Sequence, residues 1–180
     1  LTPEEIGAHF KAVKLTPAPK KQASKASAPM TPENGLKAIH LPKGYKVQLV
    51  AAEPLVKDPV AIDWGPDGKL WVAEMADYPS GVNGKAGGRV RFLEDSDGDG
   101  VYDKSTVFLD GVNFPAGIMS WQKGALVAAA PDIFYAEDTT GDGKADKRTV
   151  LYTGFKQGNQ QLRVNGLRWG LDNWVHGANG

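Results

Sequence analysis

The chain of 180 residues contains no cysteine. This absence excludes disulfides, zinc–thiolate sites, iron–sulfur clusters and covalently attached c-type haem. Its 21 basic and 21 acidic residues give a formal net charge of zero, which offers no electrostatic basis for nucleic-acid binding. No run of about 18 or more apolar residues is present, so we predict no transmembrane segment in this chain. No signal peptide is visible, and since the chain starts with Leu1 we expect a mature or trimmed form.

What the sequence does contain is an acidic loop that occurs twice. Residues 94–111 read EDSDGDGVYDKSTVFLDG and residues 137–154 read EDTTGDGKADKRTVLYTG. The two segments align without a gap at an offset of 43 residues. Self-similarity at a fixed period predicts an architecture of tandem units, and each unit therefore carries one acidic loop.

Both loops have the chemistry of a calcium site, because side-chain oxygens recur at every second position and Ca²⁺ takes about six to eight oxygen ligands. The expected ligands of the first loop are Asp95, Asp97, Asp99, the carbonyl of Val101, and Asp103. Those of the second loop are Asp138, Thr140, Asp142, the carbonyl of Lys144, and Asp146. Gly100 and Gly143 stand where a calcium loop needs its sharp turn.

The loops differ from an EF-hand. Thr106 and Thr149 replace the bidentate Glu of that motif, and the flanking segments alternate as strands do. We therefore predict two structural Ca²⁺ sites in connections between antiparallel strands. The alternative is that both loops are solvated Asp/Gly turns.

The remaining sequence divides into two parts. Residues 1–37 predict a short helix over 1–14, followed by an extended or disordered linker rich in Pro, Ala and Lys over 15–35. From residue 38 to residue 180 the pattern is all-β. A strand is expected over 45–53, and hairpins are expected over 59–75, 116–130 and 166–180.

Trp64, Trp121 and Trp169 mark the same place in the three hairpins, at steps of 57 and 48 residues. A unit of about 45 residues made of four short strands is typical of a β-propeller blade. We therefore predict about two blades and the start of a third, with the tryptophans packed between blades. Since a ring needs about four to eight blades, we expect residues 38–180 to be a partial propeller, a fragment of a six- or seven-bladed ring. The alternative is that other chains complete the ring.

Four segments carry a family resemblance: LPKGYKVQLVAAEPLVKDPVAIDWGPDGKLWVAEMADYP, RFLEDSDGDGVYDKSTVFLDGVNFPAGI, AAPDIFYAEDTTGDGKADKRTVLYTGF and NQQLRVNGLRWGLDNW. In this order, over about residues 38–180, they resemble the N-terminal part of the membrane-bound dehydrogenase domain of planctomycete and verrucomicrobial proteins. That family is similar, more remotely, to soluble glucose/sorbosone dehydrogenases, which are six-bladed propellers that hold pyrroloquinoline quinone (PQQ) with calcium.

The resemblance implies an exported, calcium-binding sugar or alcohol dehydrogenase, periplasmic or extracellular. Its cofactor would be PQQ, its substrate a carbohydrate or alcohol, and its partner a c-type cytochrome or haem domain that accepts the electrons. The alternative is a non-catalytic, calcium-stabilised propeller that binds glycans or proteins.

The resemblance also implies site residues. The catalytic His of the sugar dehydrogenases falls at Leu162 here, and Leu cannot accept a proton. His176 is the nearest alternative base in the sequence. The residues expected to face the channel and to contact a cofactor are Glu74, Arg163, Asn165 and Arg168. An arginine could pair with a quinone carboxylate, and the alternative for each of the four is an inter-blade hydrogen bond or ion pair.

Overall fold

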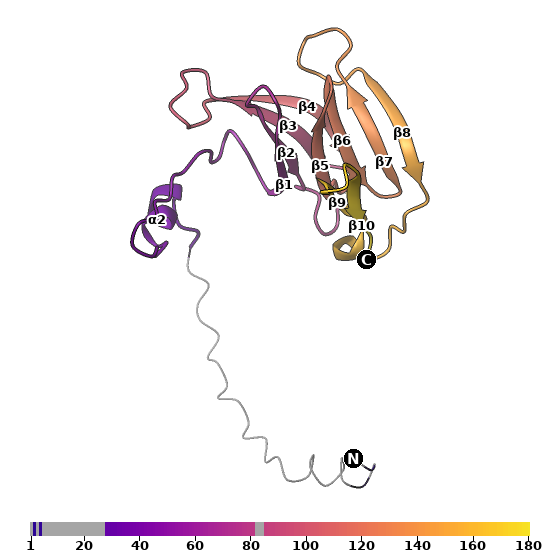
Figure 1. Ribbon diagram of the computed structural model, residues 1–180, viewed down its shortest axis with the longest axis horizontal. Helices are drawn as coiled ribbons and strands as arrows, with labels where there is room; N and C mark the ends of the chain where they lie inside the picture. Colours follow the sequence, from indigo (N-terminus) through magenta and orange to yellow (C-terminus); the bar gives the residue numbers. More distant parts are fainter. Residues whose placement is uncertain (1, 3, 5–27, 82–84) are drawn as a thin grey trace. The chain divides into compact units, whose positions relative to one another are not determined.

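The computed structural model describes Thr2, Glu4, residues 28–81 and residues 85–180 (Figure 1). It divides into two compact units, Leu1–His40 and Leu41–Gly180. The helix expected over residues 1–14 and most of the expected linker lie outside the described residues. No helix among the described residues is long and apolar enough to cross a membrane.

The first unit contains a short helix, α2 (Pro32–Lys37). The hydroxyl of Thr31 accepts a hydrogen bond from the backbone N–H of Asn34 at 3.3 Å, which caps the first turn. Proline at the first helical position has no N–H to leave unpaired, so this helix start is favoured by the local sequence. The extended linker predicted over residues 15–35 is therefore wrong for its last few residues.

The second unit is built mainly from β-strands. Its first sheet consists of β1 (Pro59–Trp64), β2 (Leu70–Glu74), β3 (Gly88–Glu94) and β4 (Lys104–Val112) in sequence order, each antiparallel to the next. The turn between β1 and β2 contains Pro66, Asp67 and Gly68, and Gly68 adopts a φ of 79°. Glycine takes this left-handed conformation without a steric penalty, so the predicted turn forms.

The second sheet repeats this order with β5 (Gly117–Trp121), β6 (Gly124–Ala129), β7 (Asp132–Glu137) and β8 (Lys147–Thr153). A 3₁₀ turn, η1 (Gln160–Leu162), then leads into a third hairpin of β9 (Asn165–Trp169) and β10 (Val175–Ala178). β9 joins β5 in parallel at the pair Gly117 and Gly166. The hairpins and flanking strands predicted from the sequence are thus present.

The strand expected over residues 45–53 does not form. Among the described residues, the segment has no neighbouring strand with which to build a ladder. One backbone hydrogen bond, from the N–H of Tyr102 to the carbonyl of Val50 at 2.8 Å, ties it to the first acidic loop. Ala51 and Val56 instead cover one face of the first sheet, against Leu70 and other buried residues.

The largest core cluster lies between the two sheets. Trp71, Phe92 and Phe108 from the first sheet pack with Ile118 and Phe134 from the second sheet. A further cluster fills the space between the second sheet and the third hairpin. Burial of such large apolar side chains from water is the main favourable term for this arrangement.

The three sequence repeats begin with β1, β5 and β9, and these strands lie next to one another in chain order. They define two ends of the second unit. At the start end, these three strands begin; at the turn end lie their hairpin turns and both acidic loops. The predicted all-β class is confirmed, as two packed sheets, and within the described residues the sheets do not close into a ring.

The marker tryptophans behave differently from one another. Trp121 is half-buried and lies 5.5 Å, centroid to centroid, from Trp169, so this pair does pack between neighbouring repeats. Trp64 is 59% exposed, and its indole N–H donates to the hydroxyl of Tyr102 at 3.0 Å within its own repeat. The expectation that all three tryptophans pack between neighbouring blades is therefore wrong for Trp64.

Candidate functional site

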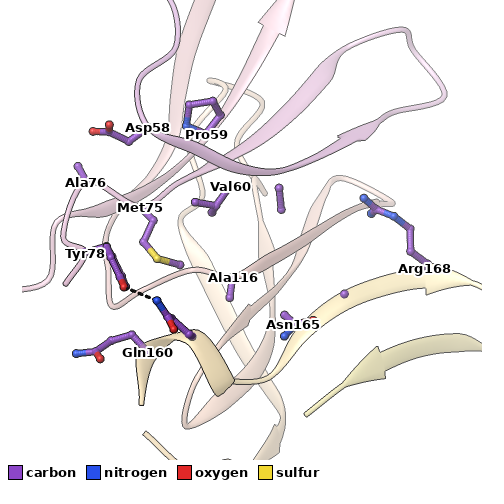
Figure 2. Close-up of a pocket in the computed structure, with 13 residues that line it drawn as sticks. Asp58, Pro59, Val60, Met75, Ala76, Tyr78, Ala116, Gln160, Asn165 and Arg168 are labelled. Carbon is purple, nitrogen blue, oxygen red and sulfur yellow. Dashed lines mark hydrogen bonds between the residues drawn. The ribbon is translucent and has the colours of Figure 1, made fainter. Parts of the chain in front are cut away.

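A pocket of about 810 Å³ opens at the start end of the second unit. Its walls come from the beginnings of β1 and β9, the segment after β2, and η1. Figure 2 shows Tyr78 and Gln160 on one side of this pocket and Arg168 on the other, with Met75 and Ala116 between them. We call it the start-end pocket.

Loops supply most of the polar groups in the start-end pocket. The hydroxyl of Tyr78 accepts a hydrogen bond from the Nε2 of Gln161 at 2.8 Å, and the Nε2 of Gln160 donates to the carbonyl of Pro79 at 2.8 Å. These two bonds join the segment after β2 to η1, across more than 80 positions in the sequence. Together they fix one wall of the pocket.

Asp58 is the one acidic residue among the described residues that line the start-end pocket. It directly precedes β1 and adopts a positive φ of 48°. This left-handed conformation is uncommon for residues other than glycine, although Asp tolerates it better than most. Its backbone carbonyl accepts the N–H of Met75 at 3.0 Å, which fixes the residue against the end of β2.

Two of the four residues predicted to contact a cofactor line this pocket, Asn165 and Arg168. The Nδ2 of Asn165 donates to the carbonyl of Arg163 at 2.9 Å, so its Oδ1 is the free end of the amide. The guanidinium of Arg168 donates to the carbonyls of Ile62 at 2.9 Å and Leu167 at 3.1 Å. The guanidinium of Arg168 is therefore already engaged in hydrogen bonds to backbone carbonyls.

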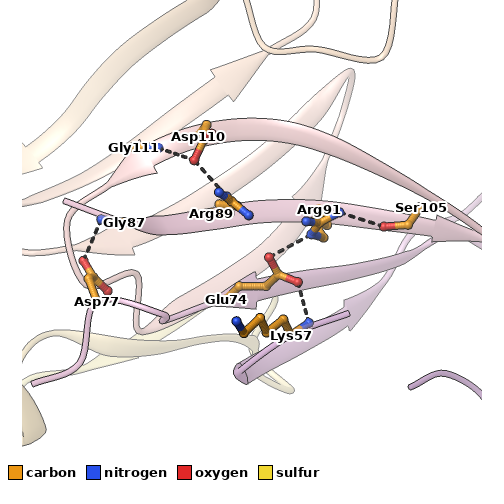
Figure 3. Close-up of polar contacts among 9 residues, drawn as sticks. All are labelled: Lys57, Glu74, Asp77, Gly87, Arg89, Arg91, Ser105, Asp110 and Gly111. Atoms are coloured by element: carbon orange, nitrogen blue, oxygen red, sulfur yellow. Dashed lines mark hydrogen bonds and ion pairs between the residues drawn. The ribbon is translucent and has the colours of Figure 1, made fainter. Parts of the chain in front are cut away.

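Glu74 and Arg163 do not line the start-end pocket. Glu74 is 2% exposed, and its carboxylate accepts from the Nε of Arg91 and from the backbone N–H of Lys57, both at 2.7 Å (Figure 3). Arg91 also donates to the hydroxyl of Ser105 at 3.1 Å. Glu74 thus makes a buried ion pair within the first sheet.

Arg163 is buried beside the pocket wall. Its guanidinium lies 4.5 Å from the ring centroid of Phe114 and donates to the carbonyl of Gln157 at 2.6 Å. The backbone N–H of Phe114 donates to the carboxylate of Asp77, a buried residue next to Tyr78. Phe114 therefore links two buried charged residues that flank the lining segments.

His176 and Leu162 also lie outside the lining of the pocket. The Nε2 of His176 contacts Asp172 at 3.0 Å in the turn of the third hairpin, and both side chains are more than half exposed. The hydrogen bond with His176 lowers the pKa of the Asp172 carboxyl below its usual value. Leu162 ends η1 and is 55% exposed.

The first acidic loop brings carboxylates together. Oxygens of Asp95, Asp97 and Asp99 all lie within 4.8 Å of one another. The Asp95 carboxylate accepts the backbone N–H of Gly100 at 2.8 Å, and this bond is the largest cause that lowers the pKa of Asp95. Ionised carboxylates in this spacing are the ligand type that Ca²⁺ prefers, so the donor set fits the ion.

The second acidic loop repeats the turn geometry but not the cluster. Asp138 accepts the N–H groups of Gly141 and Gly143, as Asp95 accepts those of Gly98 and Gly100. Within the described residues, no second group of three metal-ligating side chains gathers as the first loop does.

In both loops the carboxylate at the ninth position, a predicted Ca²⁺ ligand, already accepts hydrogen bonds within its own loop. Asp103 accepts from the N–H and hydroxyl of Ser96, and Asp146 from those of Thr139. In both loops the last of the predicted carboxylate ligands therefore stabilises the loop through hydrogen bonds. The N–H of Ala145 further donates to the carbonyl of Phe108 in the first sheet at 2.8 Å, which ties the second loop to the neighbouring sheet.

Residues 31–180 match the family model described as "Domain of unknown function (DUF7133)". The chain belongs to the DUF7133 family. No curated protein and no solved structure matches it. The match covers the whole of the second unit, so the start-end pocket and both acidic loops are parts of the DUF7133 domain.

Sequence reasoning missed Asp58, Tyr78, Gln160 and Gln161. The signal that could have found them is their position, since each lies in a connection at the start end, where β1, β5 and β9 begin. Binding residues are disproportionately found on loops that a rigid scaffold positions.

Proposed function

We propose that the second unit forms consecutive blades of a β-propeller and that its start-end pocket binds a neutral, polyhydroxylated ligand. The blade interpretation rests on the repeated four-strand order, on the contact between β1 and β5, and on the parallel pairing of β5 with β9. Radial repetition of four-stranded sheets around a central axis is the propeller architecture.

The chemistry of the lining supports the choice of ligand. The pocket combines a carboxylate, a guanidinium, amides and a phenol with an apolar surface from Val60 and Met75. Amides and carboxylates both accept hydrogen bonds from hydroxyl groups, and the amides donate as well. Arg168 is already paired with Asp63 at 3.8 Å, so among the described residues the lining offers no free cation that would demand an anionic ligand.

Calcium is the second part of the proposal. Asp95, Asp97 and Asp99 would hold Ca²⁺ at the first acidic loop, where the ion would join the two strands β3 and β4. The ion would act structurally, because this loop is at the turn end and the pocket is at the start end. At the second loop, Thr140 replaces one carboxylate, so a site formed by Asp138, Asp142 and Asp146 would be weaker.

A quinone with carboxylates fits the start-end pocket poorly. Such a group needs free cationic donors, whereas Arg168 already donates to backbone carbonyls and Asp58 would repel an anion. A PQQ-dependent sugar or alcohol dehydrogenase with a c-type cytochrome partner, like an exported location, stays a prediction from the resemblance. Asp58 is the lining residue that could accept a proton in such a reaction.

Ligand titration tests the proposal. With D-glucose and myo-inositol as probes, saturation-transfer NMR on the full chain should show saturable binding. Asp58→Ala should weaken that binding about tenfold, since a hydrogen bond to a charged group contributes roughly 1.5–3 kcal/mol. His176→Ala, outside the pocket, is the matched control and should leave binding unchanged. If neither probe saturates, or Asp58→Ala binds as tightly as the parent, this pocket is not a polyol site.

A further inference from the structure

A second cavity, of about 600 Å³, lies at the turn end between the two sheets. Its walls are the β1–β2 turn, the β5–β6 turn and the second acidic loop. We call it the turn-end cavity. Its volume is within the range of small-molecule sites, which is about 300–1,000 Å³, and it shares no lining residue with the start-end pocket.

Three aromatic side chains form one wall of the turn-end cavity. The Trp71 ring lies 5.3 Å from Phe92 and 4.8 Å from Phe108, centroid to centroid. Each of the three is more than nine-tenths buried. Their remaining accessible atoms therefore form part of a concave apolar surface, which suits an offset or edge-to-face contact with another ring.

Trp71 also presents a polar group without a partner. Among the described residues, no atom accepts a hydrogen bond from its Nε1, and this nitrogen is still accessible although the side chain is only 7% exposed. Indole N–H groups in proteins usually have an acceptor, which can be a protein atom, a water molecule or a ligand. The missing partner at Trp71 indicates that an acceptor from outside the chain would be favoured there.

Gly65 keeps the space beside this N–H open. A Cβ at this position would lie 3.1 Å from the Nε1 of Trp71, 3.1 Å from the hydroxyl of Ser120 and 2.6 Å from a carboxylate oxygen of Asp67. The polar groups of two sheets thus converge on a place where a side chain larger than hydrogen would intrude.

Two lysines and two aspartates line the cavity, and one of these lysines has no carboxylate partner among the described residues. Lys69 pairs with Asp67 at 2.8 Å, and Asp138 is held by backbone N–H groups of its own loop. Lys123 lines the cavity and forms no ion pair within the described part of the chain. An acidic ligand could therefore pair with Lys123.

We propose that the turn-end cavity binds a small planar ring compound that carries a carboxylate. The ring lies against Trp71, Phe92 and Phe108, an oxygen accepts the indole N–H of Trp71, and Lys123 compensates the negative charge. This site is independent of the polyol site proposed at the start end.

Indole N–H signals provide the test. The chain has five tryptophans, so a ¹⁵N–¹H spectrum of the full chain contains five such signals, and Trp71→Phe identifies the one that belongs to Trp71. Benzoate should shift that signal saturably at concentrations up to about 10 mM. Benzamide should do so more weakly, and acetate, which lacks a ring, should not. No tryptophan lines the start-end pocket, so binding there cannot produce this result directly.

Two variants sharpen the experiment. Lys123→Ala, at an exposed position, should weaken benzoate binding about fivefold and leave benzamide binding unchanged. Lys156→Ala, outside the cavity, should change neither. If benzoate causes no saturable shift at Trp71, or if Lys123→Ala weakens both ring compounds equally, the proposed site is wrong. If Trp71→Phe does not fold, the Trp71 signal is identified through its link to the assigned backbone, and the lysine variants then still decide the question.

Discussion

Arg168 in β9 donates a hydrogen bond from Nη2 to the carbonyl oxygen of Ile62 in β1, at 2.9 Å and across 106 residues of sequence. The same guanidinium lies 3.4 Å from the carbonyl of Ile118 in β5. One side chain thus connects the first strands of all three repeated units. In this arrangement Arg168 acts on the scaffold of the start-end pocket as well as lining it.

Removing this connection should destabilise the second unit. We expect Arg168→Ala to lower the free energy of unfolding by about 1–2 kcal/mol. This is less than a fully buried, charged hydrogen-bond network would contribute, because the side chain is 56% exposed and solvent screens its interactions. Urea denaturation measures the change. Arg89→Ala, which removes an exposed pair with Asp110, is the control and should cost less than about 1 kcal/mol. Equal losses in the two variants would contradict the bridging role.

The buried ion pair between Glu74 and Arg91 predicts a larger effect. Glu74→Ala leaves the guanidinium of Arg91 buried without its carboxylate, and loss of one partner of a buried pair costs about 3–5 kcal/mol. Glu94→Ala removes a more exposed pair with Lys104 and should cost less than about 1 kcal/mol. Chemical denaturation of both variants gives the comparison. A loss below 1 kcal/mol for Glu74→Ala would show that the pair is dispensable.

The close approach of β6 to β7 at Gly124 predicts a steric effect. A Cβ there would lie 2.0 Å from the carbonyl oxygen of Ala136 and 3.0 Å from the ring of Phe108. Gly124→Ala should therefore lower stability by about 2 kcal/mol or more, because the backbone must shift. Gly158→Ala, with nothing within 4 Å of its Cβ, should be nearly neutral. Thermal unfolding distinguishes the two, and an unchanged Tm for Gly124→Ala would disprove the contact.

Calcium should raise the stability of the folded chain. An ion that binds only the native state adds about 2.7 kcal/mol at a concentration of a hundred times Kd. We expect Asp99→Ala to abolish most of the calcium-dependent rise in Tm, and EDTA to reverse it in the parent. Asp142→Ala changes the equivalent position of the second loop and should retain most of the response. If calcium leaves the Tm of the parent unchanged, the first loop is a simple turn.

The pairing of His176 with Asp172 predicts a shift in a carboxyl titration. Because His176 lowers the pKa of Asp172, the folded carboxyl should lose its charge at a lower pH than an ordinary Asp, whose pKa is about 3.9. Its contribution to stability is then complete above that pH and is lost as the pH falls through the lowered pKa. In His176→Ala the pKa should rise towards the ordinary value, as a ¹³C titration of the side-chain carboxyl would show.

Much of the fold could be predicted because its signals are local. Alternation of apolar and polar residues along β3 and β4, and the turn residues of the β1–β2 hairpin, depend on neighbours within a few positions. The same holds for the acidic loops, where Asp95, Asp97 and Asp99 lie as close together as their spacing suggested. Local pattern failed at residues 45–53, since a strand also requires a partner ladder that this segment lacks.

The candidate site was less predictable, because it depends on which connections meet in space. Asn165 and Arg168 line the start-end pocket, whereas Glu74 is buried against Arg91. Tyr78 and Gln161 form a hydrogen bond across 83 residues. The local sequence around either residue does not predict this contact.

The amino-acid sequence by itself determined the repeat, the strands, the turns and the positions of the acidic side chains, because each of these is encoded within a few consecutive residues. Only the tertiary structure decided that β1, β5 and β9 lie side by side and that two cavities open at opposite ends. It also decided that Trp71 retains an unpaired N–H. These features arise from packing between distant segments, where burial and hydrogen bonding depend on three-dimensional neighbours.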